Sequence, residues 1–173
     1  MNTPDADTRR IGRRLGLLAT LAFLALGWVS FDGAIERRED PNRNLVVAPG
    51  ASELVLQRNR AGHYLLPGEI NGRPVRLLLD TGATQVSVPA RLAAELGLQA
   101  GAPASVLTAN GAVTVRQTRI PRLAFGPFEF RDVAGHLNPG MQGDEVLLGM
   151  SALRHLEFTQ RGDRLTLRAP GSG

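Results

Sequence analysis

The sequence contains no cysteine and no lysine, and aromatic residues make up only 5% of it. Without cysteine, the chain can form no disulfide, no thiolate metal site and no cysteine nucleophile. The three histidines, at positions 63, 136 and 155, share no metal-ligand spacing, and we expect ordinary packing or surface roles for them. The sequence suggests neither a serine, histidine and acid arrangement for nucleophilic catalysis nor a phosphate-binding loop. The sequence therefore predicts no metal and no cofactor.

All 20 basic residues are arginine, against 16 acidic residues, so the formal net charge is only +4. Four of these arginines lie in residues 1–14, and from residue 32 onward sixteen arginines face fourteen acids. A nucleic-acid-binding protein usually carries a basic patch or stripe. This near balance, with no basic cluster in the main part of the chain, argues against a nucleic-acid partner.

Residues 15–31 form a run without charge that follows a basic tail, residues 1–14. As a helix this run would span about 25 Å, the short end of the length needed to cross a bilayer. The arginines before it predict a cytoplasmic N-terminus and export of the rest of the chain. We expect an uncleaved transmembrane anchor. The alternative is a signal peptide, cleaved near Ala25-Leu26-Gly27.

The chain after the anchor divides into three parts. Residues 32–52 are rich in charge and contain Pro41, Pro49 and Gly50, which predicts a flexible linker. Residues 53–168 carry the pattern of a folded domain, and residues 169–173 form a short tail. The anchor and the linker would let this domain stand clear of the membrane on the exported side.

Short apolar segments separated by turns follow from residue 53. Asn71-Gly72 is a strong hairpin signal because both residue types tolerate a positive φ. Further turns are expected at Asn110-Gly111, Gly126-Pro127 and Gly162-Asp163. Only residues 89–96 and 151–156 suggest short helices. Many short strands, little helix and no alternation of strand and helix predict a small closed antiparallel β-barrel with one or two short helices.

The most informative stretch is Leu77-Leu78-Leu79-Asp80-Thr81-Gly82-Ala83. Three leucines predict a buried strand, and a carboxylate at its end is costly to bury ionised and alone. The carboxylate of Asp80 must therefore share a proton, find a partner or contact water. A solvated turn at the end of a strand is the simpler interpretation of these residues alone.

The order of three features resembles the retropepsin-like aspartic proteases, and especially their bacterial membrane-anchored branch. These features are Asp80-Thr81-Gly82-Ala83, a glycine-containing hairpin about thirty residues later at Asn110-Gly111, and Leu147-Leu148-Gly149 before a short helix. The resemblance covers about residues 60–168. It implies an all-β fold of retropepsin type, and an aspartic endopeptidase that cuts extended polypeptides. Together with the expected anchor, it implies a domain at the periplasmic side of a bacterial inner membrane.

The resemblance also implies roles for individual residues. Asp80 would be the catalytic carboxylate. Because the chain has one Asp-Thr-Gly triplet, a homodimer would supply the second carboxylate. Support of the active-site loop would come from Thr81, Gly82 and Ala83, a flap over the substrate from Thr108, Ala109, Asn110 and Gly111, and packing behind the loop from Leu147, Leu148 and Gly149. The alternative function is a catalytically silent peptide-binding or dimerisation module on the membrane.

Overall fold

The computed structural model describes residues 20–21, 23–24, 39–48, 50–108 and 111–171, which fall in two units, 1–38 and 39–173. In the first unit the four described residues are helical and exposed. The expected basic tail and most of the expected anchor, 15–31, lie outside the described residues. No helix among the residues described has both the length and the hydropathy needed to cross a membrane.

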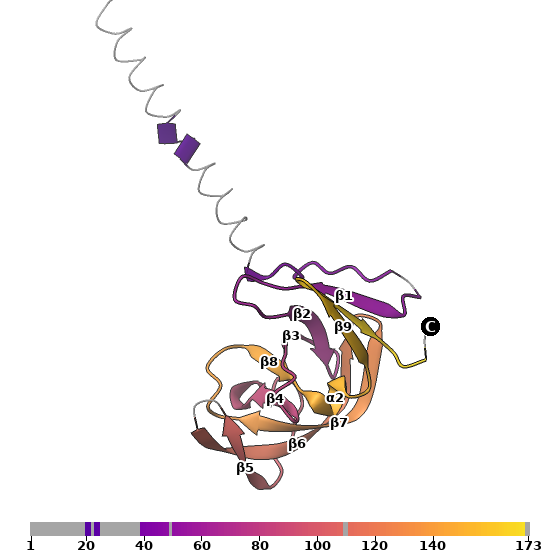
Figure 1. The fold of residues 1–173 in the computed structure, drawn as a ribbon. Coiled ribbons are helices and arrows are strands. Elements are labelled where there is room, and N and C mark those ends of the chain that lie inside the picture. The colour runs from indigo at the N-terminus through magenta and orange to yellow at the C-terminus, as the bar shows by residue number, and fades with distance from the viewer. Residues whose placement is uncertain (1–19, 22, 25–38, 49, 109–110, 172–173) are drawn as a thin grey trace, which may run out of the picture. The chain divides into compact units, whose positions relative to one another are not determined.

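The second unit is built from strands, with very little helix (Figure 1). Its described strands are β1 Glu53–Gln57, β2 Leu65–Ile70, β3 Arg73–Leu79, β4 Val86–Pro89, β5 Pro103–Thr108, β6 Gly111–Phe125, β7 Phe128–Asn138, β8 Glu145–Leu148, β9 Glu157–Arg161 and β10 Arg164–Arg168. A 3₁₀ turn, η1, spans Ala90–Leu92, and one helical turn, α2, spans Met150–Leu153. The all-β class expected from the sequence is confirmed.

Six strands close into a barrel. The larger sheet has the order β2-β3-β8-β4-β7-β6-β5, and β2 also pairs with β6, so β5 alone lies outside the closed ring. The expectation of an antiparallel barrel is wrong at two joins, because β3 pairs with β8 and β4 pairs with β7 in parallel. Hairpin turns, which dominate the sequence pattern, indicate only antiparallel neighbours. The two parallel pairs join strands far apart in the chain, so no turn in the sequence predicts them.

Two expected elements differ in length from the structure. The strands expected separately at 112–115 and 119–123 form one strand, β6, because its first part pairs with β5 and its second part with β7. The helix expected at 89–96 is reduced to η1. The hairpin turn at Asn71-Gly72 is confirmed, with φ angles of 52° and 76°.

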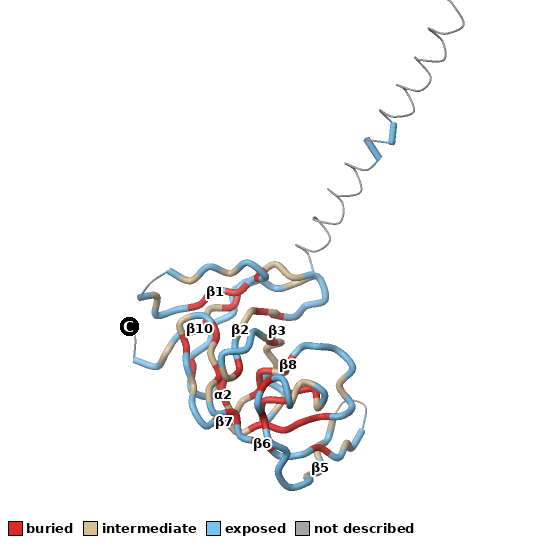
Figure 2. Tube along the Cα trace, turned by 180° about the vertical axis from the view of Figure 1, so that it is seen from behind, coloured by how far each residue is buried: buried red, intermediate tan, exposed pale blue. Residues whose placement is uncertain are grey.

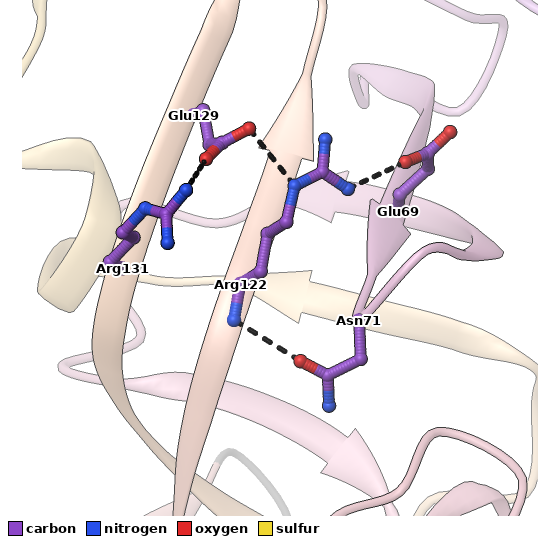
Figure 3. Close-up of polar contacts among 5 residues, drawn as sticks. All are labelled: Glu69, Asn71, Arg122, Glu129 and Arg131. Atoms are coloured by element: carbon purple, nitrogen blue, oxygen red, sulfur yellow. Dashed lines mark hydrogen bonds and ion pairs between the residues drawn. The ribbon is translucent and has the colours of Figure 1, made fainter.

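Asn71 and an ion-pair network fasten the join between β2 and β6 (Figure 3). The Asn71 side chain accepts a hydrogen bond from the Arg122 amide at 3.1 Å and donates one to the Leu96 carbonyl at 2.8 Å. The Arg122 guanidinium donates to Glu69 and to Glu129, both at 2.9 Å. These hydrogen bonds raise the pKa of Arg122, and the bond from Arg122 lowers the pKa of Glu129. The network therefore favours the charged forms that hold β2, β6 and β7 together.

The hydrophobic core fills the barrel and continues under the smaller sheet, β1-β10-β9. Its fully buried side chains include Leu56, Leu66, Ile70, Leu77, Ile120, Leu123, Leu148, Leu153 and Leu167. Figure 2 shows buried stretches along β6 and β7, whereas β5 alternates between intermediate and exposed residues. The hairpin of β5 and the start of β6 lies at the end of the barrel away from β1 and β9 (Figure 1). No residue of β5 is buried.

The segment expected as a flexible linker, 32–52, differs from that expectation in its described part. Asn42 is 4% exposed, and its side chain joins β1 to the start of β2. It donates to the carbonyls of Gln57 and Leu65 at 2.9 and 2.7 Å and accepts from the Gln57 amide at 2.8 Å. Asp40 forms an ion pair with Arg76 on β3. The folded domain thus begins near residue 39, because one buried amide satisfies backbone groups that would otherwise lack partners.

We expect Asn42→Ala to lower the free energy of unfolding by about 2 kcal/mol, because it leaves part-buried backbone groups of Gln57 and Leu65 without their partner. The matched control is Asn44→Ala, since Asn44 lies two residues away and is exposed. Chemical unfolding of the full chain measures both changes. Equal midpoints for the two variants would contradict the role of Asn42.

Candidate active site

Asp80 directly follows β3, at the point where the chain turns toward β4. The Asp80 residue is half-buried, and its amide donates to the Leu148 carbonyl on β8 at 3.1 Å. Its Oδ1 accepts a hydrogen bond from the Gly82 amide at 2.9 Å, and its carbonyl accepts one from Ala83 at 3.3 Å. The loop thus folds back on its own carboxylate. Thr81 and Gly82 remain exposed at its apex.

Gly149 and the residues after it hold this loop from behind. The amide of Met150 donates to the Ala83 carbonyl at 2.8 Å, and the amide of Ser151 donates to the Thr84 carbonyl at 2.9 Å. A Cβ on Gly149 would lie 2.3 Å from the Gln85 carbonyl oxygen and 2.7 Å from that of Ala83. The backbone at Gly149 therefore approaches the loop more closely than any other residue type allows.

Ser151 is a supporting residue that the sequence did not single out. Its hydroxyl donates to the Ala134 carbonyl on β7 at 2.7 Å and accepts a hydrogen bond from the Val86 amide on β4 at 3.0 Å. It therefore bridges two strands at the base of the loop. The only signal in the sequence was its position two residues after Leu-Leu-Gly.

A cleft of about 830 Å³ opens in front of Asp80. Its described lining comes from the Asp80 loop, from the β5–β6 hairpin and from the inner strands, and comprises Asp80, Gly82, Ala83, Thr84, Gln85, Ser87, Ala104, Ser105, Val106, Leu107, Thr108, Val115, Gln117, His136, Asn138 and Leu147. Leu148 is fully buried behind the loop, as is the backbone of Gly149. Leu147, the third residue expected behind the loop, lines the cleft. Alternation along β8 places Leu147 and Leu148 on opposite faces.

The β5–β6 hairpin covers one side of the cleft. Its strands pair from Pro103 with Arg116 to Thr108 with Gly111, and the Thr108 hydroxyl donates to the Gly111 carbonyl at 2.8 Å. Two of the four residues expected in a flap, Ala109 and Asn110, lie outside the described residues. Leu107 is 89% exposed beside the tip, so it can contact a molecule that enters the cleft.

Three polar side chains in the cleft are almost completely buried: Ser87 at 2%, His136 at 9% and Asn138 at 7% exposure. His136, for which the sequence predicted only an ordinary packing or surface role, lies on β7 beside Ser87 of β4. Burial lowers the pKa of His136, so its imidazole is neutral at neutral pH. The parallel pairing of β4 with β7, which no local pattern signals, gives this histidine its position.

The described lining of the cleft contains two titratable side chains, Asp80 and His136. Within the described ranges, no three histidine or acidic side chains gather in a group that could hold a metal ion. A single carboxylate at an open cleft can accept a proton from water or donate one to a leaving group. It cannot do both at the same moment, so acid–base chemistry on a substrate requires a second group.

Comparisons with known proteins agree with this architecture. The protein family described as "gag-polyprotein putative aspartyl protease" matches residues 66–155. The crystal structure of a retropepsin-like aspartic protease from Rickettsia conorii is similar to the chain with a TM-score of 0.58 and 30% sequence identity. The match covers 68% of this chain and 90% of the Rickettsia conorii chain.

Two curated relatives are uncharacterized proteins. The protein in the cobV 5′ region of Sinorhizobium sp is 29% identical over 178 residues, which cover 92% of this chain and 75% of the relative. A protein of Rickettsia prowazekii (strain Madrid E) is 28% identical over 108 residues, which cover 61% of this chain and 46% of the relative.

Proposed function

Because this chain belongs to the retropepsin-like aspartic protease family, we propose that it is an aspartic endopeptidase in which Asp80 from each of two copies activates water. The observation that carries the proposal is the position of Asp80. Its carboxylate lies at a cleft of about 830 Å³ beneath a β-hairpin. The loop that bears it is held by hydrogen bonds from the segment after Gly149.

Hydrolysis of a peptide bond needs a base for the attacking water and an acid for the leaving nitrogen. Two carboxyl groups that share one proton provide both, because groups so close together cannot both be negatively charged. One chain supplies one such carboxylate in its described cleft. Thr81 and Gly82 are exposed at the apex of the loop, so the same loop of a second copy, related by a two-fold axis, can contact it there. The dimer would therefore be part of the mechanism.

An extended polypeptide is the substrate class that suits this cleft. The cleft lies between the Asp80 loop and the exposed edge of the β5–β6 hairpin, and a chain in extended form can use main-chain hydrogen bonds and alternate side-chain pockets there. Closure of the hairpin over the substrate would exclude water from the reacting carbonyl group.

The test of this function uses the purified full-length chain in detergent and a library of unstructured peptides. Mass spectrometry identifies the products. We expect internal cleavage that a transition-state analogue of aspartic proteases blocks. Cleavage that the analogue leaves unchanged, or no cleavage over the acidic to neutral pH range, would contradict an aspartic endopeptidase.

Residues 15–31 support a further part of the proposal, an uncleaved anchor that holds the protease domain at the periplasmic face. The supporting feature is a run of 17 residues without charge after four arginines. An externally added protease acting on spheroplasts measures the orientation. The domain should be digested, and protection of it until the membrane is lysed would contradict the proposed topology.

Confinement to a membrane raises the effective concentration of a protein, so a weak dimer can assemble there. If Asp80 acts as a pair, the activity per molecule should fall as the full chain is diluted in excess detergent. Dilution into a constant amount of lipid vesicle should preserve that activity better than detergent does. A rate strictly proportional to protein concentration down to the lowest measurable value would contradict activity limited by dimerisation.

A further inference from the structure

A row of side chains crosses four neighbouring strands on the cleft side of the barrel. The strand registers align Leu147 on β8 with Ser87 on β4, Ser87 with His136 on β7, and His136 with Gln117 on β6. Residues opposite one another in a sheet lie on the same face. All four line the cleft, and three of the four are polar.

The residues next to this row face the other way. Val86 and Val88 on β4 are fully buried, Leu137 on β7 is 3% exposed, and all three belong to the hydrophobic core. Alternation along a strand therefore puts apolar side chains in the core and Ser87 and His136 in the cleft. The polar row is a property of the cleft and not of the core.

These buried polar groups retain hydrogen-bonding capacity. Within the described part of the chain the Ser87 hydroxyl donates to one group, the Met141 sulfur at 3.2 Å, and a thioether sulfur is a weak acceptor. The carbonyl oxygen of the Asn138 side chain accepts from the Gly140 amide at 2.8 Å. Among the described residues, no hydrogen bond joins the imidazole of His136 or the Asn138 amide nitrogen to another group. Neither residue contributes to the buried side-chain atoms that lack a partner among the described residues, so these nitrogens are open to the cleft. A ligand that covers them must supply hydrogen-bond partners, because leaving them covered and unpaired is costly.

From this row we propose a subsite in the cleft, formed by Ser87, His136, Gln117 and Asn138, that selects a substrate residue with an uncharged amide side chain, asparagine or glutamine. An amide group carries both donors and an acceptor. A neutral imidazole, a hydroxyl and a carboxamide present both kinds of partner in return. An aliphatic side chain at the same place would desolvate these groups and pair none of them.

This subsite deepens the proposed peptidase function and rests on it only for the identity of the ligand as a peptide. The aliphatic part of a glutamine or asparagine side chain can lie against Leu147 at the end of the row. Leu147 and Val106 are two of the apolar residues in the same lining. The cleft thus offers apolar contacts as well as hydrogen-bonding groups.

The test measures binding apart from cleavage. Full-length Asp80→Asn is titrated with peptides that differ only at one position, glutamine or asparagine against leucine or methionine, each position in turn. We expect about tenfold tighter binding of the amide peptide at one position, corresponding to one or two net hydrogen bonds. His136→Leu should abolish or reverse that ratio and leave the ratios at other positions unchanged.

Two further variants keep the result interpretable. Gln117→Leu changes an exposed member of the row, so it reports on the subsite even if His136→Leu fails to fold. His63→Leu, outside the cleft and exposed, is the matched control and should keep the preference. An equal or aliphatic preference at every position, or an amide preference that both cleft variants retain, would overturn the subsite. Amide selectivity without cleavage by the wild-type chain would overturn the peptidase function and leave the subsite standing.

Discussion

Asp80→Asn should lower the rate of peptide cleavage about a thousandfold, within the range that general acid–base catalysis contributes, while the fold stays intact. Asparagine has nearly the same shape as aspartate, and its carbonyl oxygen can still accept the Gly82 hydrogen bond that Asp80 accepts at 2.9 Å. The change removes the titratable carboxyl group from both members of the proposed pair at once. Loss of activity with an unchanged unfolding midpoint would therefore reflect chemistry and not structure.

The matched control for this variant is Asp132→Asn. Asp132 is exposed on β7 with a φ of 53°, a conformation that asparagine also tolerates, and it does not line the cleft. This variant should keep full activity. Cleavage at the wild-type rate by Asp80→Asn would remove Asp80 from the mechanism. Binding of peptides by the wild-type chain without any cleavage would favour the alternative, a silent peptide-binding module.

Gly149→Ala is expected to lower the free energy of unfolding by about 3 kcal/mol, the upper part of the usual range for overpacking a buried site. The φ of Gly149 is −91°, so alanine could adopt its backbone conformation. The cost is steric, since the new Cβ would lie 2.3 Å from the Gln85 carbonyl oxygen and 2.7 Å from that of Ala83. Both are backbone atoms of the loop that carries Asp80. That loop must therefore move to relieve the contact.

Gly62→Ala separates this steric effect from ordinary glycine effects. Gly62 has a φ of +86°, and a Cβ added there would meet no atom within 4 Å, so its replacement costs only the backbone conformation, about 1 kcal/mol. Chemical unfolding of both variants gives the comparison, and peptide cleavage gives a second measurement. Gly149→Ala should also lose activity in conditions where it remains folded. A midpoint no lower than that of Gly62→Ala would contradict the close approach at Gly149.

The turns of the fold could be predicted from the sequence because their determinants are local. Asn71-Gly72 has two residue types that tolerate positive φ, and the structure gives both residues that conformation. The flanking leucines and valines alternate with polar residues or form short apolar runs, as strands require. Most strands could therefore be predicted from the sequence. The order in which strands pair did not follow, because a parallel join such as β3 with β8 depends on contacts between residues about seventy positions apart.

The start of the domain shows a second limit. Residues 32–52 have the composition of a linker, yet Asn42 is buried and bridges β1 and β2 through three hydrogen bonds. Asparagine is a common turn residue, and nothing in the sequence around it indicates that it lies inside. Its role comes from the backbone groups of Gln57 and Leu65, which are defined only once the strands are in place.

The sequence by itself determined that the chain is an all-β protein with one Asp-Thr-Gly loop after a buried strand. These features are written in short-range residue patterns, and their spacing pointed to the retropepsin-like family. Only the tertiary structure decided which residues share the cleft with Asp80. The parallel register of β4 with β7 places Ser87 and His136 side by side in the cleft, and that of β3 with β8 leads the chain to Gly149 behind the loop. Both pairings join strands that are distant in the chain through long crossover connections, so no local residue pattern specifies them.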